Sequence, residues 1–312
     1  MRGIFAIAGP TCSGKTALSV RLARHVGGEV VNFDSVQLYK GIEIATAKPT
    51  EEEKQGIPHH LIDYVDPNID YTAADWAADA TRVIEEIESR GKIPILVGGT
   101  GFYLRTLRQP LFESPKTDRN LRERLRRIKN HRGPEHLHKM LTRVDPGLAA
   151  TLPRNDYVRV MRGLEVYFQT GEKLSEKQPD RSEPPEFSNR IILFVLNPPR
   201  DELYEKINCR TQGHFENGLA GEVKDLLAEG VNEAGNALGA HAYRRVCEYL
   251  RGTRDLMSAI EQSKQDVRNY AKRQFTWFRR EKDAIWLDGF GDEEAVWERL
   301  LDLIDGQERA RN

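Results

Sequence analysis

The sequence predicts an α/β protein whose core is a P-loop-containing, doubly wound parallel sheet interrupted by an all-helical insertion domain. Short, near-continuous apolar runs alternate with longer segments of helical spacing, as in parallel sheets that helices cover on both faces. A glycine-rich loop follows the first apolar run and leads into the first helix. The apolar runs then stop in the middle of the chain and resume near residue 191.

Five apolar runs are the expected strands, at residues 4–9, 29–34, 93–99, 191–197 and 284–289. The first helix is expected over residues 15–26, because Gly27 and Gly28 end the helical spacing there. A second helix is expected around an apolar stripe that ends before Gly91 and consists of Ala80, Val83, Ile84 and Ile87. Strands and helices that alternate in this order predict parallel strand pairing.

The middle of the chain predicts a separate helical unit. Residues 117–175 show helical spacing at Leu121, Leu125 and Ile128 and no convincing strand. The exit from this segment, residues 175–190, is rich in Pro, Ser and charge and is expected to be an exposed loop. We therefore predict three segments, with residues 1–113 and 190–312 forming the core and residues 114–189 forming the insertion.

The composition sets limits on partners and location. Lys and Arg number 47 against 48 Asp and Glu, so a polyanionic partner would have to meet local basic patches. Three cysteines without C-x-x-C spacing argue against a disulfide framework or a zinc site, which fits a cytoplasmic protein. The apolar start is too short to span a bilayer and is expected to be the first strand, so no membrane partner is expected.

Residues 9–16 read GPTCSGKT, which matches the sequence motif of a phosphate-binding loop between a strand and a helix. Gly9 and Gly14 allow successive N–H groups to point inward, Lys15 adds a positive charge, and the Thr16 hydroxyl is a candidate ligand for Mg²⁺. The motif indicates two linked phosphates and leaves the rest of the ligand open. The residues expected to bind them are Gly9, Pro10, Thr11, Cys12, Ser13, Gly14, Lys15 and Thr16.

Two further strand ends are expected at the same edge of the sheet. The run at residues 29–34 ends at Asp34, and the segment LVGGTGFY at residues 96–103 carries Thr100 among glycines. Ligands of doubly wound sheets bind beyond the carboxyl ends of the strands, so Asp34 should face the same crevice as the glycine loop. Asp34 is a candidate base, a candidate Mg²⁺ ligand or a cap of the following turn. The glycines around Thr100 are by themselves weak evidence of a site.

Six segments, taken together and in order, resemble the tRNA dimethylallyltransferases, also called tRNA isopentenyltransferases, of the bacterial type. They read GPTCSGKT, NFDSVQLYKGIEIATAKPT, PHHLIDYVDPNIDYTAADW, ILVGGTGFYL, LEVYFQTGEKLS and YAKRQFTWFR. The resemblance implies that the loop holds dimethylallyl diphosphate, with Mg²⁺. It also implies that the dimethylallyl group passes to the exocyclic amine of the adenosine immediately 3′ of the anticodon in tRNA.

The resemblance also implies roles for single residues. Asp34 would be the base, Arg210 would lie over the diphosphate, and Thr100 would lie near the reacting amine. Without the resemblance, Arg210 would be interpreted as a solvated helix residue. The implied tRNA-binding residues are Asp34, Ser35, Val36, Gln37, Thr100, Arg122, Arg159, Arg162, Tyr243, Arg244 and Arg273.

Two basic stretches, residues 119–132 and 268–282, would offer a surface to the anticodon stem-loop, although such runs are usually solvated helix faces. Within the second stretch, one stripe is expected to join the core: Val267, Ala271, Phe275 and Phe278. Arg273, Trp277 and Arg280 share another face and are candidates to meet phosphate or a loop base.

Three places depart from the family pattern. Val36 stands where Arg is common, Tyr157 and Val158 replace Pro-Gln, and Ala242 stands where Gly is usual. If that last position needs a positive φ, Ala242 would cost about 1 kcal/mol. The departure at Val36 puts a polar contact at that position in doubt.

Three other functions remain compatible with parts of the sequence. An enzyme that prenylates free adenine nucleotides would share the loop, Asp34 and Arg210 but would not need Arg159 and Arg162. A small-molecule P-loop kinase would use the insertion as a lid but leaves LVGGTG and YAKRQFTWFR unexplained. A tRNA-binding protein without activity would not need an intact Lys15. The sequence therefore favours a tRNA prenyltransferase, and we expect a monomer.

Overall fold

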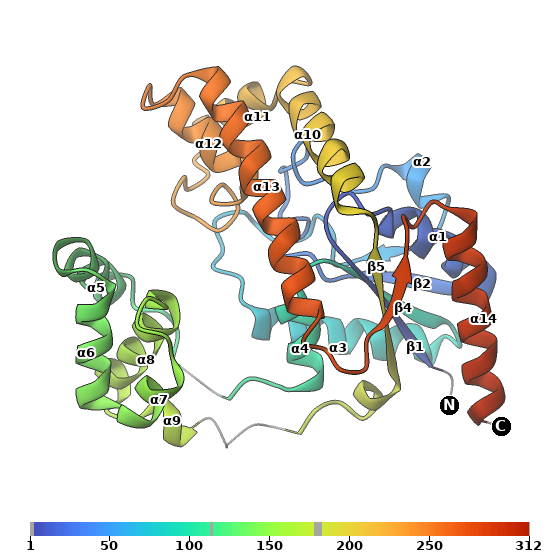
Figure 1. The fold of residues 1–312 in the computed structure, drawn as a ribbon, viewed down its shortest axis with the longest axis horizontal. Coiled ribbons are helices and arrows are strands. Elements are labelled where there is room, and N and C mark those ends of the chain that lie inside the picture. The colour runs from blue at the N-terminus through green and yellow to red at the C-terminus, as the bar shows by residue number, and fades with distance from the viewer. Residues whose placement is uncertain (1–2, 113–114, 178–182, 312) are drawn as a thin grey trace. The chain divides into compact units, whose positions relative to one another are not determined.

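The sheet of the core confirms the predicted fold class. The computed structural model describes residues 3–112, 115–177 and 183–311 (Figure 1). Six strands pair in parallel in the order β3-β2-β4-β1-β5-β6. Their bounds are β1 (Ile4–Ala8), β2 (Gly28–Asn32), β3 (His59–His60), β4 (Ile93–Gly98), β5 (Ile191–Asn197) and β6 (Ile285–Asp288). Strand β3 was not predicted, because it is only two residues long and carries no apolar run.

Helices cover both faces of this sheet (Figure 1). One face packs against α1 (Lys15–Val26) and α14 (Glu294–Arg311), and the other packs against α3 (Ala73–Ser89) and α4 (Gly101–Arg108). Successive side chains of a strand point to opposite faces. In β1, accordingly, Phe5 and Ile7 join the cluster with α1, while Ile4 and Ala6 join the cluster with α3.

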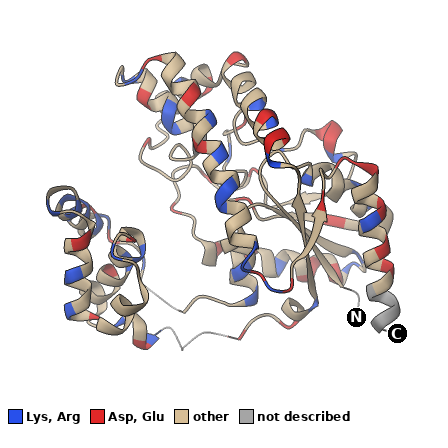
Figure 2. Ribbon diagram, viewed as in Figure 1, with Lys and Arg blue, Asp and Glu red and all other residues tan. Residues whose placement is uncertain are grey.

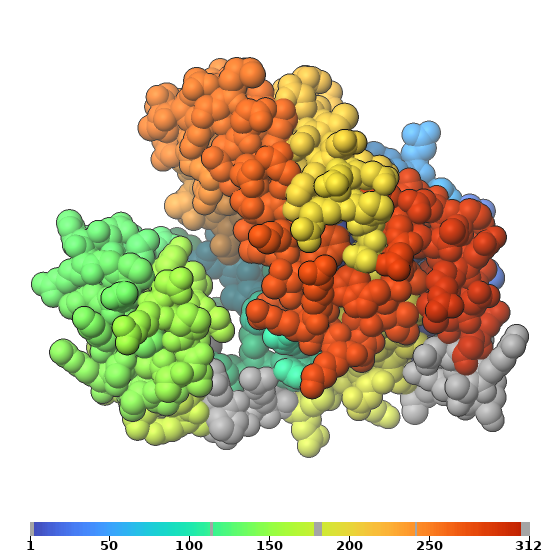
Figure 3. Space-filling model, in the orientation of Figure 1, coloured from blue at the N-terminus to red at the C-terminus, as the bar shows by residue number. Residues whose placement is uncertain are grey.

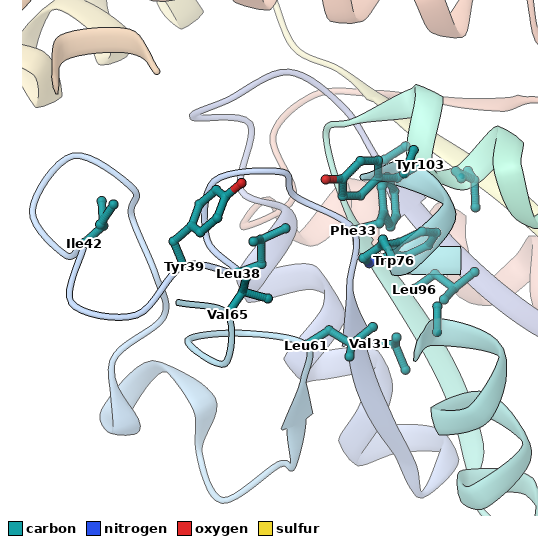
Figure 4. Packing of buried hydrophobic residues seen from close by; sticks show 14 of the residues in the cluster. Val31, Phe33, Leu38, Tyr39, Ile42, Leu61, Val65, Trp76, Leu96 and Tyr103 are labelled. Atoms are coloured by element: carbon teal, nitrogen blue, oxygen red, sulfur yellow. The ribbon is translucent and has the colours of Figure 1, made fainter. Parts of the chain in front are cut away.

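A buried aromatic group fixes the end of β2, where Asp34 follows (Figure 4). The rings of Trp76 on α3 and Tyr103 on α4 stack with their centroids 5.1 Å apart. The indole Nε1 of Trp76 donates a hydrogen bond of 2.9 Å to the carbonyl oxygen of Asn32, the last residue of β2. Because both rings are almost fully buried, this contact ties α3 and α4 to the strand end that carries the candidate base.

The remaining helices of the core lie between β2 and β3, directly before β5, and between β5 and β6. They are α2 (Glu51–Lys54), the 3-10 helix η1 (Glu186–Arg190), α10 (Arg200–Glu216), α11 (Leu219–Ala228), α12 (His241–Leu250) and α13 (Leu256–Phe278). The long helix α13 packs against both α10 and α12, and α10 and α13 lie side by side on the surface of the core (Figure 3). The predicted core stripe of α13 is confirmed, since Ala271, Phe275 and Phe278 are buried and Val267 is partly buried against Ala271 and Phe275.

Contacts divide the chain into two compact units, one of residues Met1–Arg108 and Pro185–Asn312 and the other of residues Gln109–Pro184. The sequence placed the insertion at residues 114–189 instead. The expected exit loop contains η1, and the side chain of Phe187 within it is buried in the core, so this segment belongs to the core. Residues 178–182 of the expected loop lie outside the described residues.

The second unit is built from helices around its own small core. The helices are α5 (Arg119–Arg132), α6 (Pro134–Val144), α7 (Pro146–Thr151), α8 (Tyr157–Thr170) and α9 (Leu174–Lys177). The predicted stripe of α5 is confirmed, with Leu125 buried and Leu121 and Ile128 partly buried against the same cluster. In the parts of the chain that the structure describes, no helix is both long and apolar enough to cross a membrane.

Candidate active site

The glycine loop joins β1 to α1, as its sequence predicts. Gly9 and Gly14 have φ angles of 153° and 83°, which residues with a side chain rarely adopt. A Cβ on Gly14 would also lie 2.7 Å from the backbone nitrogen of Gly291, so the loop packs tightly on the turn after β6. The backbone of the loop therefore leads directly into the N-terminus of α1, where N–H groups and the helix dipole favour an anion.

Lys15 lies in a site that makes its positive charge costly. Its Nζ donates a 2.6 Å hydrogen bond to the carbonyl oxygen of Pro10. The pKa of Lys15 is lowered to about 8, chiefly by burial; the carboxylate of Asp34 opposes this shift and the guanidinium of Arg210 adds to it. These electrostatic effects show that the loop, the end of β2 and α10 bring their charged groups into one neighbourhood.

Asp34 combines two of the interpretations that the sequence left open. Its Oδ1 accepts hydrogen bonds from the backbone N–H groups of Val36 at 2.9 Å and Gln37 at 3.4 Å, so the carboxylate caps the turn after β2. Asp34 also lines a cavity together with Thr11 of the phosphate loop. The capping bonds hold the carboxylate at the carboxyl end of the sheet, facing the loop.

Thr100 is bonded to the same turn. Its Oγ1 accepts a 3.1 Å hydrogen bond from the N–H of Ser35 and lies 3.2 Å from the Ser35 hydroxyl. The approach of the two segments requires a glycine, because a Cβ on Gly98 would lie 2.6 Å from the backbone of Phe33. Asp34 and Thr100 were predicted to share one edge of the sheet, and the structure brings their segments into contact there.

Arg210 belongs to the site and is not a freely solvated helix residue. It lies on α10 and donates a hydrogen bond from Nη2 to the hydroxyl of Thr11 in the phosphate loop. Arg210 is partly buried and lines the same cavity as Asp34. The expectation from the residues alone, a solvated side chain, is therefore wrong, and the structure places a fixed positive charge beside the loop.

The cavity between these groups has a volume of about 40 Å³. Polar and apolar side chains line it together. The polar or charged ones are Thr11, Asp34, Thr46, Arg210, Thr211, His214 and Tyr270, and the apolar ones are Val36, Ala45, Ala242 and Val267. A cavity of this size accommodates water molecules, so a five-carbon group would enter only if side chains of the wall moved apart.

Two side chains of α13 that face this site were not predicted. Gln274 is buried and bonds both to the N–H of Thr11 and to the carbonyl oxygen of Gly99. Tyr270 lines the cavity, and its pKa is raised by burial and by the negative charge of Asp34, whereas a hydrogen bond with Thr100 lowers it. The four-residue spacing of these two positions, beside the apolar stripe of α13, is the sequence signal that would have found them.

Trp277, on the next turn of α13, packs within the core. Its ring lies so close to Gly101 that a Cβ there would be 2.1 Å from Cδ1, and the guanidinium of Arg105 lies 4.3 Å above the ring. The hypothesis that Trp277 meets a nucleotide is not needed to explain its position. Arg273 and Arg280, from the same predicted face, are exposed.

The residues around the turn after β2 are largely held by the protein. Val36 is buried, and Nε2 of Gln37 donates to the carbonyl oxygens of Thr46 at 3.1 Å and Ala47 at 2.9 Å. Ala47 itself adopts a φ of 53°, a left-handed conformation that costs free energy in a residue with a side chain. Gln37 thus fixes a strained loop to the turn that carries Asp34.

The N-terminal part of α12 explains why alanine is tolerated at a position where the family usually has glycine. Ala242 lies in the first turn of α12 and does not have a positive φ. Its backbone therefore does not carry the conformational cost of about 1 kcal/mol that a positive φ would impose on alanine. Tyr243 is fully buried; its hydroxyl donates to Glu222 at 2.7 Å and accepts from the N–H of Ala45 at 3.1 Å. Arg244 is exposed and lies 3.7 Å from Asp266.

The insertion holds two of its three candidate tRNA contacts in place. Nε and Nη2 of Arg122 donate to the two carboxylate oxygens of Glu165, at 2.5 and 2.7 Å, and Glu165 is fully buried. Arg162 lies 3.5 Å from the same carboxylate and donates to the carbonyl oxygen of Pro115. Arg159 is exposed and pairs with Asp156 one turn earlier.

Basic residues run along α5 and α13, as the sequence predicted (Figure 2). On the insertion, Arg126 and Lys129 line a hollow of about 320 Å³ together with Tyr157 and Val158, which replace the usual Pro-Gln. The ammonium group of Lys129 lies 4.5 Å above the ring of Tyr157. Each unit therefore exposes its own basic surface.

Comparisons with known proteins agree with this geometry. The IPP transferase family profile matches residues 37–281. A tRNA dimethylallyltransferase of Koribacter versatilis is 43% identical over 301 residues, covering 96% of this chain and 97% of that protein. One of Geobacter sulfurreducens is 46% identical over 282 residues, covering 90% of each chain.

Solved structures give the same result. The full-length tRNA isopentenylpyrophosphate transferase of Bacillus halodurans superposes with a TM-score of 0.71 at 35% identity, covering 100% of this chain and 99% of that one. A eukaryotic dimethylallyltransferase captured acting on tRNA gives a TM-score of 0.75 at 31% identity, covering 92% of this chain and 74% of that one. The chain therefore belongs to the IPP transferase family, and its relatives along nearly its whole length are tRNA dimethylallyltransferases.

Proposed function

We propose that this chain transfers the dimethylallyl group of dimethylallyl diphosphate to the exocyclic amine of the adenosine immediately 3′ of the anticodon in tRNA, releasing diphosphate. One observation carries the proposal: Thr11 of the phosphate loop, Asp34 and Arg210 line one cavity, together with the apolar side chains of Val36 and Val267. Such a site suits a ligand with a charged end and a hydrocarbon end.

The phosphate loop would hold the diphosphate. Backbone N–H groups at the N-terminus of α1 and the ammonium group of Lys15 supply donors for it, and Arg210 supplies a second positive charge from α10. These groups stabilise the charge that develops on the leaving diphosphate as it departs. The fixed position of Arg210 on Thr11 means that little reorganisation is needed during the reaction.

Asp34 would act as the base. The lone pair of an adenine amine is delocalised into the ring, so the amine is a weak nucleophile and benefits from proton removal. The amine nitrogen bonds to C1 of the dimethylallyl group while the bond from C1 to the diphosphate oxygen breaks. The bonding electrons leave with diphosphate, and the amine proton passes to the Asp34 carboxylate. Thr100 and Tyr270 would contact the adenine side of the site.

The donor chemistry of the loop fits Mg²⁺, which prefers hard oxygen ligands. The Thr16 hydroxyl would hold the ion beside the diphosphate. When bound, Mg²⁺ would neutralise part of the negative charge on the diphosphate.

The tRNA would approach with the target adenosine turned out of its stack. Ser35, Val36 and Gln37 would border the extruded base, and the exposed guanidinium groups of Arg159, Arg244 and Arg273 would meet phosphates. We further propose a monomer that acts in the cytoplasm.

A labelling experiment tests the proposal. The protein is incubated with dimethylallyl diphosphate carrying a label in its hydrocarbon, with Mg²⁺, and with either unmodified tRNA or AMP. We expect label in tRNA, at the adenosine next to the anticodon after nuclease digestion. Label in AMP alone would assign the chain to free nucleotides. No prenyl transfer to either acceptor, with ATP consumed in a matched assay, would assign it to the kinases.

A further inference from the structure

Gln274 on α13 joins two loops of the core that are far apart in the sequence. Its Oε1 accepts a 2.9 Å hydrogen bond from the N–H of Thr11 in the phosphate loop. Its Nε2 donates a 3.1 Å hydrogen bond to the carbonyl oxygen of Gly99, which follows β4. The side chain is 4% exposed, so water does not substitute easily for either bond.

The backbone of the second loop is shaped to receive this amide. A Cβ on Gly99 would lie 2.0 Å from Nε2 of Gln274, a distance that side-chain atoms do not tolerate. Gly99 does not have a φ in the left-handed region, so its backbone conformation alone does not call for glycine. A side chain at position 99 would therefore displace the Gln274 amide from the place it holds between the two loops.

The two ends of the Gln274 amide contact two different parts of the proposed active site, here called the diphosphate half and the acceptor half. On one side, Thr11 accepts a hydrogen bond from Arg210 through its hydroxyl, and both belong to the diphosphate half. On the other side, Gly99 precedes Thr100, whose hydroxyl is bonded to Ser35 next to Asp34 in the acceptor half. Gln274 lies where the two halves meet.

We propose that Gln274 is a positioning residue that fixes the phosphate loop against the Thr100 loop. It thereby holds the leaving diphosphate and the acceptor amine at the relative position that the transfer requires. The inference rests on the transfer reaction proposed above. Bond formation at C1 and bond cleavage at the same carbon require both substrates to be held at once, and a misplacement of about 1 Å can lower the rate about 100-fold.

This role differs from binding either substrate. Gln274 is bonded to the protein on both sides, so its loss should leave each half able to bind its own ligand. The loss should instead change the position of one ligand relative to the other. Such a change lowers kcat and leaves the dissociation constant of each ligand unchanged. A role in folding alone would instead lower thermal stability and the fraction of active protein.

The first experiment replaces Gln274 with methionine, which has similar length and neither hydrogen bond. We expect kcat for tRNA prenylation to fall about 10- to 100-fold. The dissociation constants of inorganic diphosphate and of unmodified tRNA, measured separately by calorimetry, should stay within about threefold of the wild type. The matched control is Gln265→Met, which makes the same change at an exposed position of the same helix.

The second experiment uses Gln274→Glu. As a carboxylate, this side chain accepts from the N–H of Thr11 but repels the carbonyl oxygen of Gly99; once protonated, it can donate to that oxygen as the amide does. The charged groups around this position are Lys15 and Arg210 on one side and Asp34 and Arg273 on the other, and Tyr270 is a neutral phenol there.

The readout is the ratio of variant to wild-type kcat between about pH 8.5 and about pH 6. We expect the ratio to rise as the pH falls for Gln274→Glu and to stay flat for Gln274→Met. Dividing by the wild-type rate removes the titration of groups that both proteins share. A structural role would give two flat ratios.

Gly99→Ala provides an independent variant, because the added Cβ displaces the Gln274 amide without touching it chemically. It should reproduce the kinetic defect of Gln274→Met, and the double variant should be little worse than either single one. The proposal is overturned if Gln274→Met keeps kcat within about twofold of the wild type, or if its loss is matched by weaker binding of diphosphate or tRNA. Wild-type protein that fails to prenylate tRNA would instead refute the proposed function.

Discussion

The two units hold their functional side chains in opposite ways. At the carboxyl edge of the core sheet, Thr11, Gln274 and Gly99 are bonded across separations of 263 and 175 residues. In the insertion, Arg159 pairs with Asp156 one turn away, and Arg122 is held by Glu165 within the same helical unit. The core therefore fixes its side chains by bonds between distant segments of the chain, whereas the insertion holds its charges by ion pairs within one small helical unit. Changes in the core should alter rate, and changes in the insertion should alter tRNA affinity.

The largest expected effect is at Asp34. Asp34→Asn keeps a side-chain oxygen that can accept from the N–H of Val36, so the turn after β2 should persist. The base is lost, and we expect kcat to fall by about 10² to 10⁴ with tRNA affinity within a few-fold of the wild type. Single-turnover kinetics and filter binding measure the two quantities. Asp34→Ala should be at least as slow, and near-normal rates for Asp34→Asn would show that another group takes the proton.

The second effect is a pH dependence at Lys15. Its pKa is lowered to about 8, chiefly by burial, so the ammonium form that attracts diphosphate is populated below that pH. Because diphosphate binds the protonated form, it raises the pKa in the complex, and affinity is present below about pH 8 and lost as the pH rises above it. We expect the dissociation constant of inorganic diphosphate to increase up to about tenfold per pH unit between pH 8 and the pKa of the complex.

Lys15→Arg is the control for this titration, since arginine keeps its charge across the whole range. Its absolute affinity need not equal that of the wild type; its pH profile should report only the ionisation of diphosphate itself. Identical slopes in the two proteins would place the titrating group elsewhere than at Lys15.

The third change tests the insertion. Glu165→Gln removes the buried charge that holds Arg122 by two hydrogen bonds and lies 3.5 Å from Arg162. We expect a loss of about 1–3 kcal/mol in the free energy of unfolding and an increase of about tenfold in KM for tRNA, with kcat nearly unchanged. Thermal melts and steady-state kinetics measure both. The matched control is Glu172→Gln, which removes a surface ion pair with Lys177 and should change little.

A drop in kcat with an unchanged KM for tRNA would contradict the division of labour between the units. It would mean that the buried Glu165 acts on the geometry of catalysis, as the residues of the core do, and not on the presentation of Arg122.

The same difference explains what the sequence could and could not predict. Local signals, such as the spelling of residues 9–16 and the stripe of α5, identified the phosphate loop and the helical insertion. Gln274 was not predicted as a site residue, because its role depends on two loops that are far away in the sequence and that only the folded chain brings together. The spacing of α13 shows that residue 274 lies beside the core stripe but not what it meets. Likewise, no pattern reveals that Glu165 is buried beneath Arg122.

The smallest expected effect concerns Tyr243, which the family resemblance assigns to tRNA and the structure buries. Its hydroxyl bonds Glu222 and the N–H of Ala45, which lies in the loop fixed by Gln37. Tyr243→Phe loses both the bond donated to Glu222 and the bond accepted from Ala45. It should therefore cost about 1–2 kcal/mol in the free energy of unfolding and leave KM for tRNA nearly unchanged. Tyr249→Phe, on the same helix, is the control. Unchanged stability combined with a raised KM for tRNA would instead mean that Tyr243 leaves the interior to contact RNA. In that case α12, although part of the core, would bind tRNA as the helices of the insertion do.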